Sequence, residues 1–341
     1  MRIIRIVIII ILGLHISYAS NAKEIHVKQG DNLQEKIDNA LGGDVLLLEP
    51  GIYAAVAINS RNFSKDAFLT IKKIGSEGEA IIKGTGYSEG SAVDVMNSSY
   101  IIFEEICFEY GLYGIVIKHS NHLVFFNCII RDIGQEAMEI LDNTRIVDVI
   151  GGKIHDAGKR PGYAKWGEGI YVGGGRNLET TIVSDVWIEG IELFNCGKSE
   201  AVNFKANVKR STIRNCYIHD IHPGTEDQYN EGAISVESGD VTSSRNDIWV
   251  ENNTVFDVYG GRFNRGITFF GAGVVVKNNT VYNCEDIGIY GHSWMDQGFL
   301  NYVHGNTVHN CHPQMTITPS INVSYENPGT NPYSPQDWYK K

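Results

Sequence analysis

Proline and positive charge are both scarce in this chain of 341 residues, which has 8 prolines and 29 lysines plus arginines against 40 aspartates plus glutamates. The formal net charge of −11 at pH 7 argues against a surface that binds nucleic acid or an anionic membrane. The shortage of proline beside 37 glycines indicates many tight corners and few rigid linkers. Because hydrophobic residues make up 43% of the chain, it can build a sizeable core and is not a disordered chain.

Apolar runs long enough to cross a bilayer are also lacking. The longest, Ile6–Leu14, has nine residues, follows a positively charged start and precedes a stretch rich in small residues. This pattern is typical of a secretory signal peptide rather than of a transmembrane helix. We therefore expect residues 1–22 to be a signal peptide, cleaved after Ala19 or Ala22, and the protein to be secreted or periplasmic.

None of the six cysteines shows C-x-x-C spacing, which argues against a zinc site. Cysteines of an exported chain can form disulfides, but a chain of this length does not need them to fold. We expect the cysteines to be buried and reduced.

A phrase of seven residues recurs seven times between residues 127 and 311. It begins with Asn or Gly, carries an aliphatic residue at its fourth position and Asp or Asn at its sixth, and alternates with the period of a β-strand. The fourth positions are Ile130, Ile154, Leu193, Ile218, Val255, Val281 and Val308. Their spacing, in the mid-twenties with two longer intervals, indicates a solenoid with insertions on some coils.

A second column of aliphatic residues has its own near-regular spacing. Its members are Ile115, Met138, Ile170, Val202, Ile234, Ile267 and Ile289. No helical pattern of useful length lies between the copies, and leucine-rich repeats or propeller blades would need a different framework. The two columns therefore predict an all-β chain folded as a parallel β-helix, with the aliphatic residues stacked inside from coil to coil.

The N-terminal part of this solenoid has a pattern of its own. Asn32–Leu41 shows apolar residues at helical spacing and precedes a buried strand with its turn, Gly43–Tyr53. A helix there would cap the open end of the first coil. This stretch resembles the start of secreted, pectate-lyase-like proteins, which implies a right-handed β-helix, and the resemblance extends to about residue 312. We expect the β-helix over residues 23–314 and a C-terminal cap or a loose tail over residues 315–341.

Residues flanking the second inward column point outward. One outward row places Glu136, Glu168 and Glu200 at 32-residue intervals, on coils separated by roughly 4.8 Å. Such carboxylates repel one another, so they must be protonated, bridged by basic side chains or bound to a cation. Calcium prefers several oxygen ligands at flexible geometry. A calcium site formed by the three glutamates and Asn203 is one interpretation, and a solvated acidic face is the other.

Lys205 follows Glu200 on the same expected strand and is the candidate catalytic base. A lyase that acts on uronates removes the proton beside the sugar carboxylate, which requires that the charge of this carboxylate is neutralised and that a base is present. A lysine can be that base only if burial or a nearby positive charge lowers its pKa. The spacing Glu200-x-x-x-x-Lys205 resembles polysaccharide lyase family 6, which includes alginate lyases and chondroitinase B. The resemblance implies that the glutamate binds calcium and that the lysine is the base. The family's basic partner is missing one coil later, and Arg265 or Arg262, two coils on, is the candidate substitute.

Two insertions between the repeats offer walls for a substrate. The first, residues 158–166, is a basic and aromatic loop in an acidic chain, and the second spans residues 222–230. Cations can pair with sugar carboxylates and aromatic rings can stack on sugars, although an ordinary exposed loop has the same composition. The candidate substrate-binding residues are Lys159, Arg160, Tyr163, Lys165, Trp166, Tyr171, His222 and Tyr229.

The predicted function is that of a secreted, monomeric polysaccharide lyase that cleaves an acidic polysaccharide by β-elimination. The chain has no Asp-Asp pair, which argues against polygalacturonase-type hydrolysis, and it lacks the pectate-lyase phrase Trp-Ile-Asp-His. Two alternatives remain open. A uronate C5-epimerase shares the proton abstraction, and a non-catalytic glycan-binding or adhesion protein needs only the basic and aromatic wall.

Overall fold

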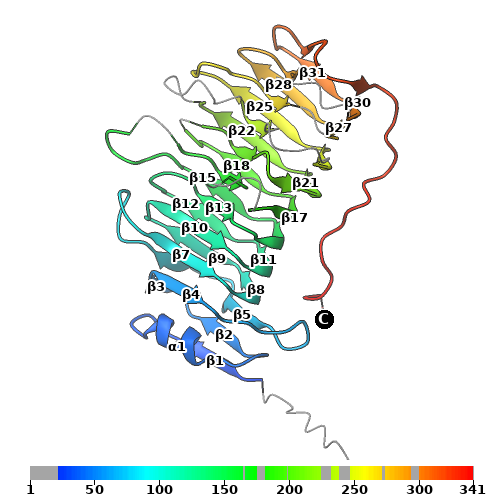
Figure 1. Cartoon of the computed structure of the whole chain (residues 1–341). Helices are drawn as coiled ribbons and strands as arrows, with labels where there is room; N and C mark the ends of the chain where they lie inside the picture. Colours follow the sequence, from blue (N-terminus) through cyan, green and yellow to red (C-terminus); the bar gives the residue numbers. More distant parts are fainter. Residues whose placement is uncertain are drawn as a thin grey trace, which may run out of the picture.

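The computed structural model describes residues 22–163, 166–174, 181–197, 199–223, 232–237, 246–270, 273–292 and 299–340. The predicted signal peptide lies outside these ranges except for Ala22, and so do two candidate site residues, Lys165 and Tyr229. The described strands wind into one continuous stack of coils, with a single described helix at its N-terminal end (Figure 1). That helix, α1 (Leu33–Asn39), has seven residues, so no helix in these ranges could span a membrane.

Each complete coil contributes one strand to each of three parallel sheets. Sheet A contains β1 (Glu24–Val27), β2 (Val45–Leu48), β5 (Leu69–Lys73), β8 (Ser99–Glu104), β11 (Asn121–Phe126), β14 (Arg145–Ile150), β17 (Val183–Glu189), β21 (Ser211–Arg214), β24 (Ile248–Glu251), β27 (Val275–Lys277), β30 (Asn301–His304) and β33 (Val323–Ser324), with β20 (Val208–Lys209) also paired to β17. Sheet B contains β3 (Gly51–Ala54), β6 (Ala80–Lys83), β9 (Ile106–Glu109), β12 (Ile129–Arg131), β15 (Lys153–His155), β18 (Glu192–Phe194), β22 (Tyr217–Ile221), β25 (Thr254–Val258), β28 (Thr280–Cys284) and β31 (Thr307–His309). Sheet C contains β4 (Val56–Asn59), β7 (Ser91–Met96), β10 (Tyr113–Lys118), β13 (Met138–Leu141), β16 (Ile170–Val172), β19 (Val202–Phe204), β23 (Ile234–Val236), β26 (Ile267–Phe269), β29 (Ile289–Gly291) and β32 (Met315–Ile317).

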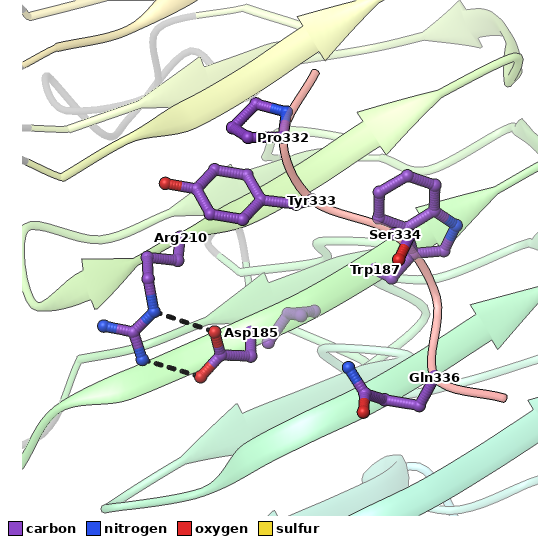
Figure 2. A pocket seen from close by; sticks show the side chains of 8 residues that line it. Asp185, Trp187, Arg210, Pro332, Tyr333, Ser334 and Gln336 are labelled. Atoms are coloured by element: carbon purple, nitrogen blue, oxygen red, sulfur yellow. Dashed lines mark hydrogen bonds and ion pairs between the residues drawn. The ribbon is translucent and has the colours of Figure 1, made fainter. Parts of the chain in front are cut away.

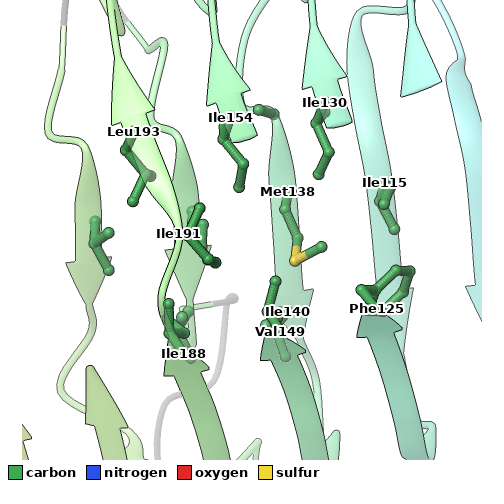
Figure 3. Close-up of a cluster of buried hydrophobic side chains, with 14 of the residues drawn as sticks. Ile115, Phe125, Ile130, Met138, Ile140, Val149, Ile154, Ile188, Ile191 and Leu193 are labelled. Atoms are coloured by element: carbon green, nitrogen blue, oxygen red, sulfur yellow. The ribbon is translucent and has the colours of Figure 1, made fainter. Parts of the chain in front are cut away.

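The aliphatic fourth position of the repeat stacks in sheet B as predicted. Each member pairs in register with the next, from Ile130 with Ile154 through to Val281 with Val308. The first six are at most 2% exposed, and Val308, in the last repeat, is half-buried against the core. Figure 3 shows part of this stack, with apolar side chains from the three sheets filling the interior. Because similar residues of successive coils stack on one another, they form one continuous buried core that no single coil could form alone.

The second predicted column stacks in sheet C. Ile115 pairs with Met138, and the register continues one coil at a time to Ile289, with every member fully buried. The prediction of a right-handed parallel β-helix is therefore confirmed. All six cysteines are free and buried, also as expected.

The polar positions of the repeat form the corners between sheets. Every sixth position, from Asp132 to Asn310, has a positive φ between 50° and 59°, and every first position has one between 50° and 66°. Only Gly, Asn and Asp adopt this left-handed conformation readily. At the second position, the buried Asn253 and Asn279 form a ladder in which the side chain of Asn279 accepts from the backbone N–H of Asn253 at 2.9 Å. The repeat is thus a strand flanked by two corners.

The capping helix is present but shorter than predicted. Asn32 is its N-cap, and its side chain accepts a hydrogen bond from the Glu35 backbone at 3.2 Å. Leu33 and Ile37 are buried against the first coils. The helix ends at Asn39, and Leu41, expected on its apolar face, is 62% exposed.

Strand pairing continues past the expected boundary at residue 314, because β32 and β33 still join sheets C and A. Residues 325–340, which we call the strap, then run back along sheet A towards the early coils (Figure 1). The backbone N–H of Gln336 donates to Asp148 Oδ2 at 2.9 Å, and Trp338 packs edge-on against Tyr100, with ring centroids 5.3 Å apart. The strap therefore covers a side of the helix rather than its last coil.

An outward-facing row of sheet A is buried. Its members pair in register and are Val124, Asp148, Trp187, Thr212, Trp249 and Val275. Figure 2 shows the strap passing over sheet A near the Arg210–Asp185 ion pair, whose closest atoms are 2.7 Å apart. A small pocket there is lined by Asp185, Val186, Trp187, Arg210, Pro332, Tyr333, Ser334 and Gln336.

Candidate functional site

The candidate site lies on the outer face of sheet C, over β13, β16, β19 and β23. Val202 and Phe204 belong to the interior core, so Asn203 between them points outward. Asn203 pairs in register with Tyr171 on one side and Ser235 on the other. Asn203 and Ser235 are nevertheless only 1% and 0% exposed. This face is therefore a buried polar surface rather than a solvated one.

The three glutamates of the predicted row are also buried, which excludes a solvated acidic face. Glu136, Glu168 and Glu200 are 7%, 3% and 1% exposed. Burial, with the charge of Glu168 adding to it, raises the pKa of Glu136 to about 9 and that of Glu200 to about 7. Glu168 accepts from the Gly167 backbone at 2.9 Å, and the Ser199 hydroxyl donates to Glu200 at 2.6 Å. Protonation, at least of Glu136, thus relieves the repulsion within the row at neutral pH.

The expected calcium ligands do not gather around one point. Within the described ranges, no group of three or more His, Cys, Asp or Glu side chains could hold a metal ion. Asn203, the fourth expected ligand, donates from Nδ2 to Glu237 at 3.2 Å. Calcium also accepts amide and backbone carbonyl oxygens as ligands, so calcium binding stays a prediction.

Lys205 lies at the centre of the site. β19 has only three residues, so Glu200 precedes the strand and Lys205 follows it. The Lys205 ammonium pairs with Glu237 at 2.5 Å and lies 5.1 Å from the centroid of the Tyr171 ring. The Lys205 side chain is 20% exposed and can be reached from solvent.

The expectation that burial or positive charge lowers the pKa of Lys205 is wrong. Burial alone would lower it, but the charge of Glu237, followed by Tyr171 and Glu200, outweighs burial and raises the pKa of Lys205 above its ordinary value. Lys205 is therefore an ammonium at neutral pH.

Tyr171 is the second proton-bearing group of the centre. Burial raises the pKa of Tyr171, the charge of Lys205 opposes this shift, and Glu237 adds to it. The phenol is thus protonated at neutral pH, and the neighbouring ammonium stabilises its anion when the proton leaves. Two groups able to exchange protons with a ligand therefore lie side by side.

Arg265 is not brought to Lys205. It lies two coils beyond Glu200, roughly 10 Å away at the spacing of neighbouring strands. Its guanidinium lies 4.4 Å from the Phe263 ring centroid and 4.0 Å from that of Tyr290, and its Nε is 3.5 Å from Asp286. Arg265 therefore marks a separate position farther along the same face.

The basic and aromatic loop divides into two parts. Lys159 pairs with Asp132 and lies 3.4 Å from Asp156, so its charge is already matched. Arg160, by contrast, lies 4.3 Å from the Tyr163 ring centroid and donates to Gln135 at 3.4 Å. Because Gln135 is next to Glu136, this second part borders the glutamate end of the row.

Two further predicted residues lie at the edges of the site. Trp166 is 42% exposed, and its ring centroid is 5.2 Å from that of Tyr163. His222 follows β22 of sheet B and packs edge-on against Tyr259, with ring centroids 4.3 Å apart. Trp166 can therefore contact a ligand beside Arg160, whereas His222 belongs to the corner after sheet B.

Sequence reasoning missed two acidic residues of the site, Glu139 and Glu237. Burial raises the pKa of Glu139 to about 7, with Lys118 opposing the shift and Glu168 adding to it. Strand alternation places both residues in outward rows, beside Tyr171 and Lys205, but gives no sign that they belong to the site.

Four buried polar atoms on this side of the helix have no hydrogen-bond partner among the described residues. They are Gln135 Nε2, Glu136 Oε2, Asn203 Oδ1 and Ser235 Oγ. Native proteins rarely leave buried polar groups unpaired unless water or a ligand completes them. The site can therefore receive a polar ligand, pair an anion with Lys205 and exchange a proton through Tyr171.

Known structures share the fold but not a close sequence relationship. An alginate lyase from Paenibacillus sp. str. FPU-7 superposes with a TM-score of 0.68 at 20% identity, covering 89% of this chain and 98% of that one. Pectate lyase Pel9A gives 0.61 at 12% identity, covering 92% and 82%. A GH136 lacto-N-biosidase from Eubacterium ramulus gives 0.57 at 11% identity, covering 89% and 68%. No protein-family model and no curated protein matches the sequence. The fold is that of pectate-lyase-like β-helices. These structures include both lyases and a glycosidase, so the fold by itself does not specify the reaction.

Proposed function

We propose that the protein is a secreted polysaccharide lyase that cleaves an acidic, uronate-containing polysaccharide by β-elimination. The observation that carries the proposal is the pair formed by Lys205 and Tyr171, set in a buried polar row with unpaired atoms. An ammonium suits a sugar carboxylate, and a phenol beside it suits proton transfer.

In the proposed reaction, the charge of Lys205 stabilises the negative charge that develops when the proton beside the sugar carboxylate is removed. Tyr171, as phenolate, takes that proton. The electron pair left behind forms the new carbon–carbon double bond as the glycosidic C–O bond breaks, and the Tyr171 phenol formed in the first step returns its proton to the leaving oxygen. A base role for Lys205 itself would require it to lose the proton that Glu237 helps to hold.

The direct test is incubation of the protein with alginate, pectate and a glycosaminoglycan in turn. A lyase produces an unsaturated uronate, so absorbance near the band of that product should rise with wild-type protein and stay flat with Lys205→Ala. Failure of the wild type on every uronate polymer would reject the lyase proposal.

The same assay separates the two alternatives. A C5-epimerase would exchange the C5 proton with deuterated solvent without shortening the chain or producing the absorbance. A glycan-binding or adhesion protein would retain the polymer without either signal. The fold is compatible with all three functions, and the proton-transfer pair favours the two enzymes.

We further propose that the substrate is the acidic polysaccharide alone, with no nucleic acid, and that the protein acts as a monomer. Calcium is an additional proposal, because a cation could replace the proton held in the glutamate row. Its test is thermal unfolding at pH 9 with millimolar calcium or with chelator. A melting temperature that calcium does not raise would reject calcium binding by this row.

A further inference from the structure

Lys205 already holds a carboxylate in this structure. Its ammonium and the Asn203 amide both donate to one oxygen of Glu237, at 2.5 and 3.2 Å. β19 positions the two donors, and Glu237 directly follows β23 on the next coil. An internal acid therefore occupies the position where two donors converge.

The chemistry of this contact is that of a bound sugar carboxylate. An ammonium and an amide N–H are ordinary donors to a carboxylate oxygen. The side chains of Lys205 and Glu237 are 20% and 29% exposed, so an external group can reach and replace the internal one. The adjacent Asn203 Oδ1 and Ser235 Oγ lack described partners, so the polar floor is incomplete while Glu237 is in place.

We propose that Glu237 is an internal stand-in for the substrate's carboxylate, which an acidic sugar must displace in order to bind. The inference rests on the proposed function only in taking an acidic polysaccharide as the ligand. It makes Glu237 a residue that determines specificity, because a neutral glycan carries no anionic group that could replace the Glu237 carboxylate on Lys205. It also explains why an acidic side chain lies where a basic partner was expected.

The test compares the wild type with Glu237→Gln, which removes the competing charge and keeps the shape. Binding of oligouronates from alginate and pectate is measured by calorimetry at fixed ionic strength, with a neutral oligosaccharide of equal length as reference. We expect the oligouronate Kd to fall about fivefold, the scale of a partly exposed ion pair. Binding of the neutral oligosaccharide should not change.

The matched control is Glu192→Gln on sheet B, where Glu192 pairs with Lys153 at 2.7 Å. It changes the net charge equally and lies away from the site, so the oligouronate Kd should stay at the wild-type value. Oligouronate binding by Glu237→Gln that is unchanged, weaker or absent would overturn the inference.

Two further measurements keep the result decisive. If Glu237→Gln does not fold, Glu237→Asp withdraws the carboxylate from Lys205 and should tighten binding in the same direction. Absorbance of the unsaturated product is recorded separately. Tighter binding by Glu237→Gln without cleavage by the wild type would support the stand-in role and reject the lyase. Cleavage by the wild type without tighter binding by Glu237→Gln would support the lyase and reject the stand-in role.

Discussion

Sheets A and C both bury a row of side chains that points away from the core, but the rows differ in character. The row on sheet A is mostly apolar, and the strap lies along it. The row on sheet C contains Tyr171, Asn203 and Ser235, and polar atoms there lack described partners. A covered apolar row stabilises the fold, whereas a buried polar row with unpaired atoms costs stability. The contrast indicates which side of the helix serves a ligand.

Among substitutions on the two sheets, we expect the largest effect from one on sheet C, and we expect it on activity. Lys205→Ala removes the only positive charge beside Tyr171 that the structure describes, so kcat/KM for the cleaved uronate should fall by about 10³-fold. Because this substitution also leaves Glu237 without its ammonium partner, thermal unfolding is measured alongside to show that the variant is folded at the assay temperature. Lys153→Ala, which removes a lysine paired on sheet B, is the control and should keep full activity. An active Lys205→Ala enzyme would contradict the site.

Tyr171→Phe should lower kcat by about 10²-fold, because it removes the group that transfers the proton while keeping the ring. The wild-type rate should also rise with pH above neutrality. The pKa of Tyr171 is raised, so the phenolate becomes more populated as the solution becomes more alkaline. Initial rates from pH 6 to 10 check this, and a wild-type profile that falls over this range would remove Tyr171 as the base.

On sheet A, the corresponding change affects stability. Trp338→Ala removes the strap's contacts with Tyr100 and Phe68 and should reduce the free energy of unfolding by about 2 kcal/mol. Specific activity of the folded protein should be retained. Tyr325→Ala, in the same segment but 60% exposed, is the matched control for denaturant unfolding. Equal midpoints for the two variants would show that the strap does not stabilise the helix.

The smallest effect is a change in the pH dependence of stability. Burial raises the pKa of Asp148 to about 7, while the Gln336 N–H opposes the shift. The folded state thus holds a proton that the unfolded state loses near pH 4. This contribution to stability is complete below pH 4 and is lost as pH rises towards 7. Asp148→Asn should flatten the decline in unfolding free energy over that window, whereas Asp38→Asn, at an exposed position of α1, should not.

Most of the fold could be predicted from local sequence because its rules are local. The aliphatic fourth position, the alternation by two and the Asn, Asp and Gly corners each depend on conformational preferences of a few residues. Repetition then sets the register, since each coil packs on a near copy of itself. The positions of Tyr171, Asn203 and Lys205 on one face followed from the same alternation.

The protonation states could not be predicted in this way. Lys205 pairs with a glutamate that lies 32 positions later in the sequence, and the glutamate row is buried away from water. Both features depend on burial and on the distances between coils. These quantities decide whether Lys205 is a base or an ammonium, and whether Glu136 carries charge. Arg265 and Lys159 show the same limit, because each is matched by an acidic partner from another part of the chain.

The sequence by itself determined the coil, its corners, its capping helix and the outward rows, because strand alternation and left-handed turns are encoded within each repeat. Only the tertiary structure decided that the strap runs back along sheet A, because Pro332 and Trp338 carry no local signal for a partner more than a hundred residues away. It also decided that Glu237 pairs with Lys205. Charge pairing and desolvation act through space, and they have no period in the sequence.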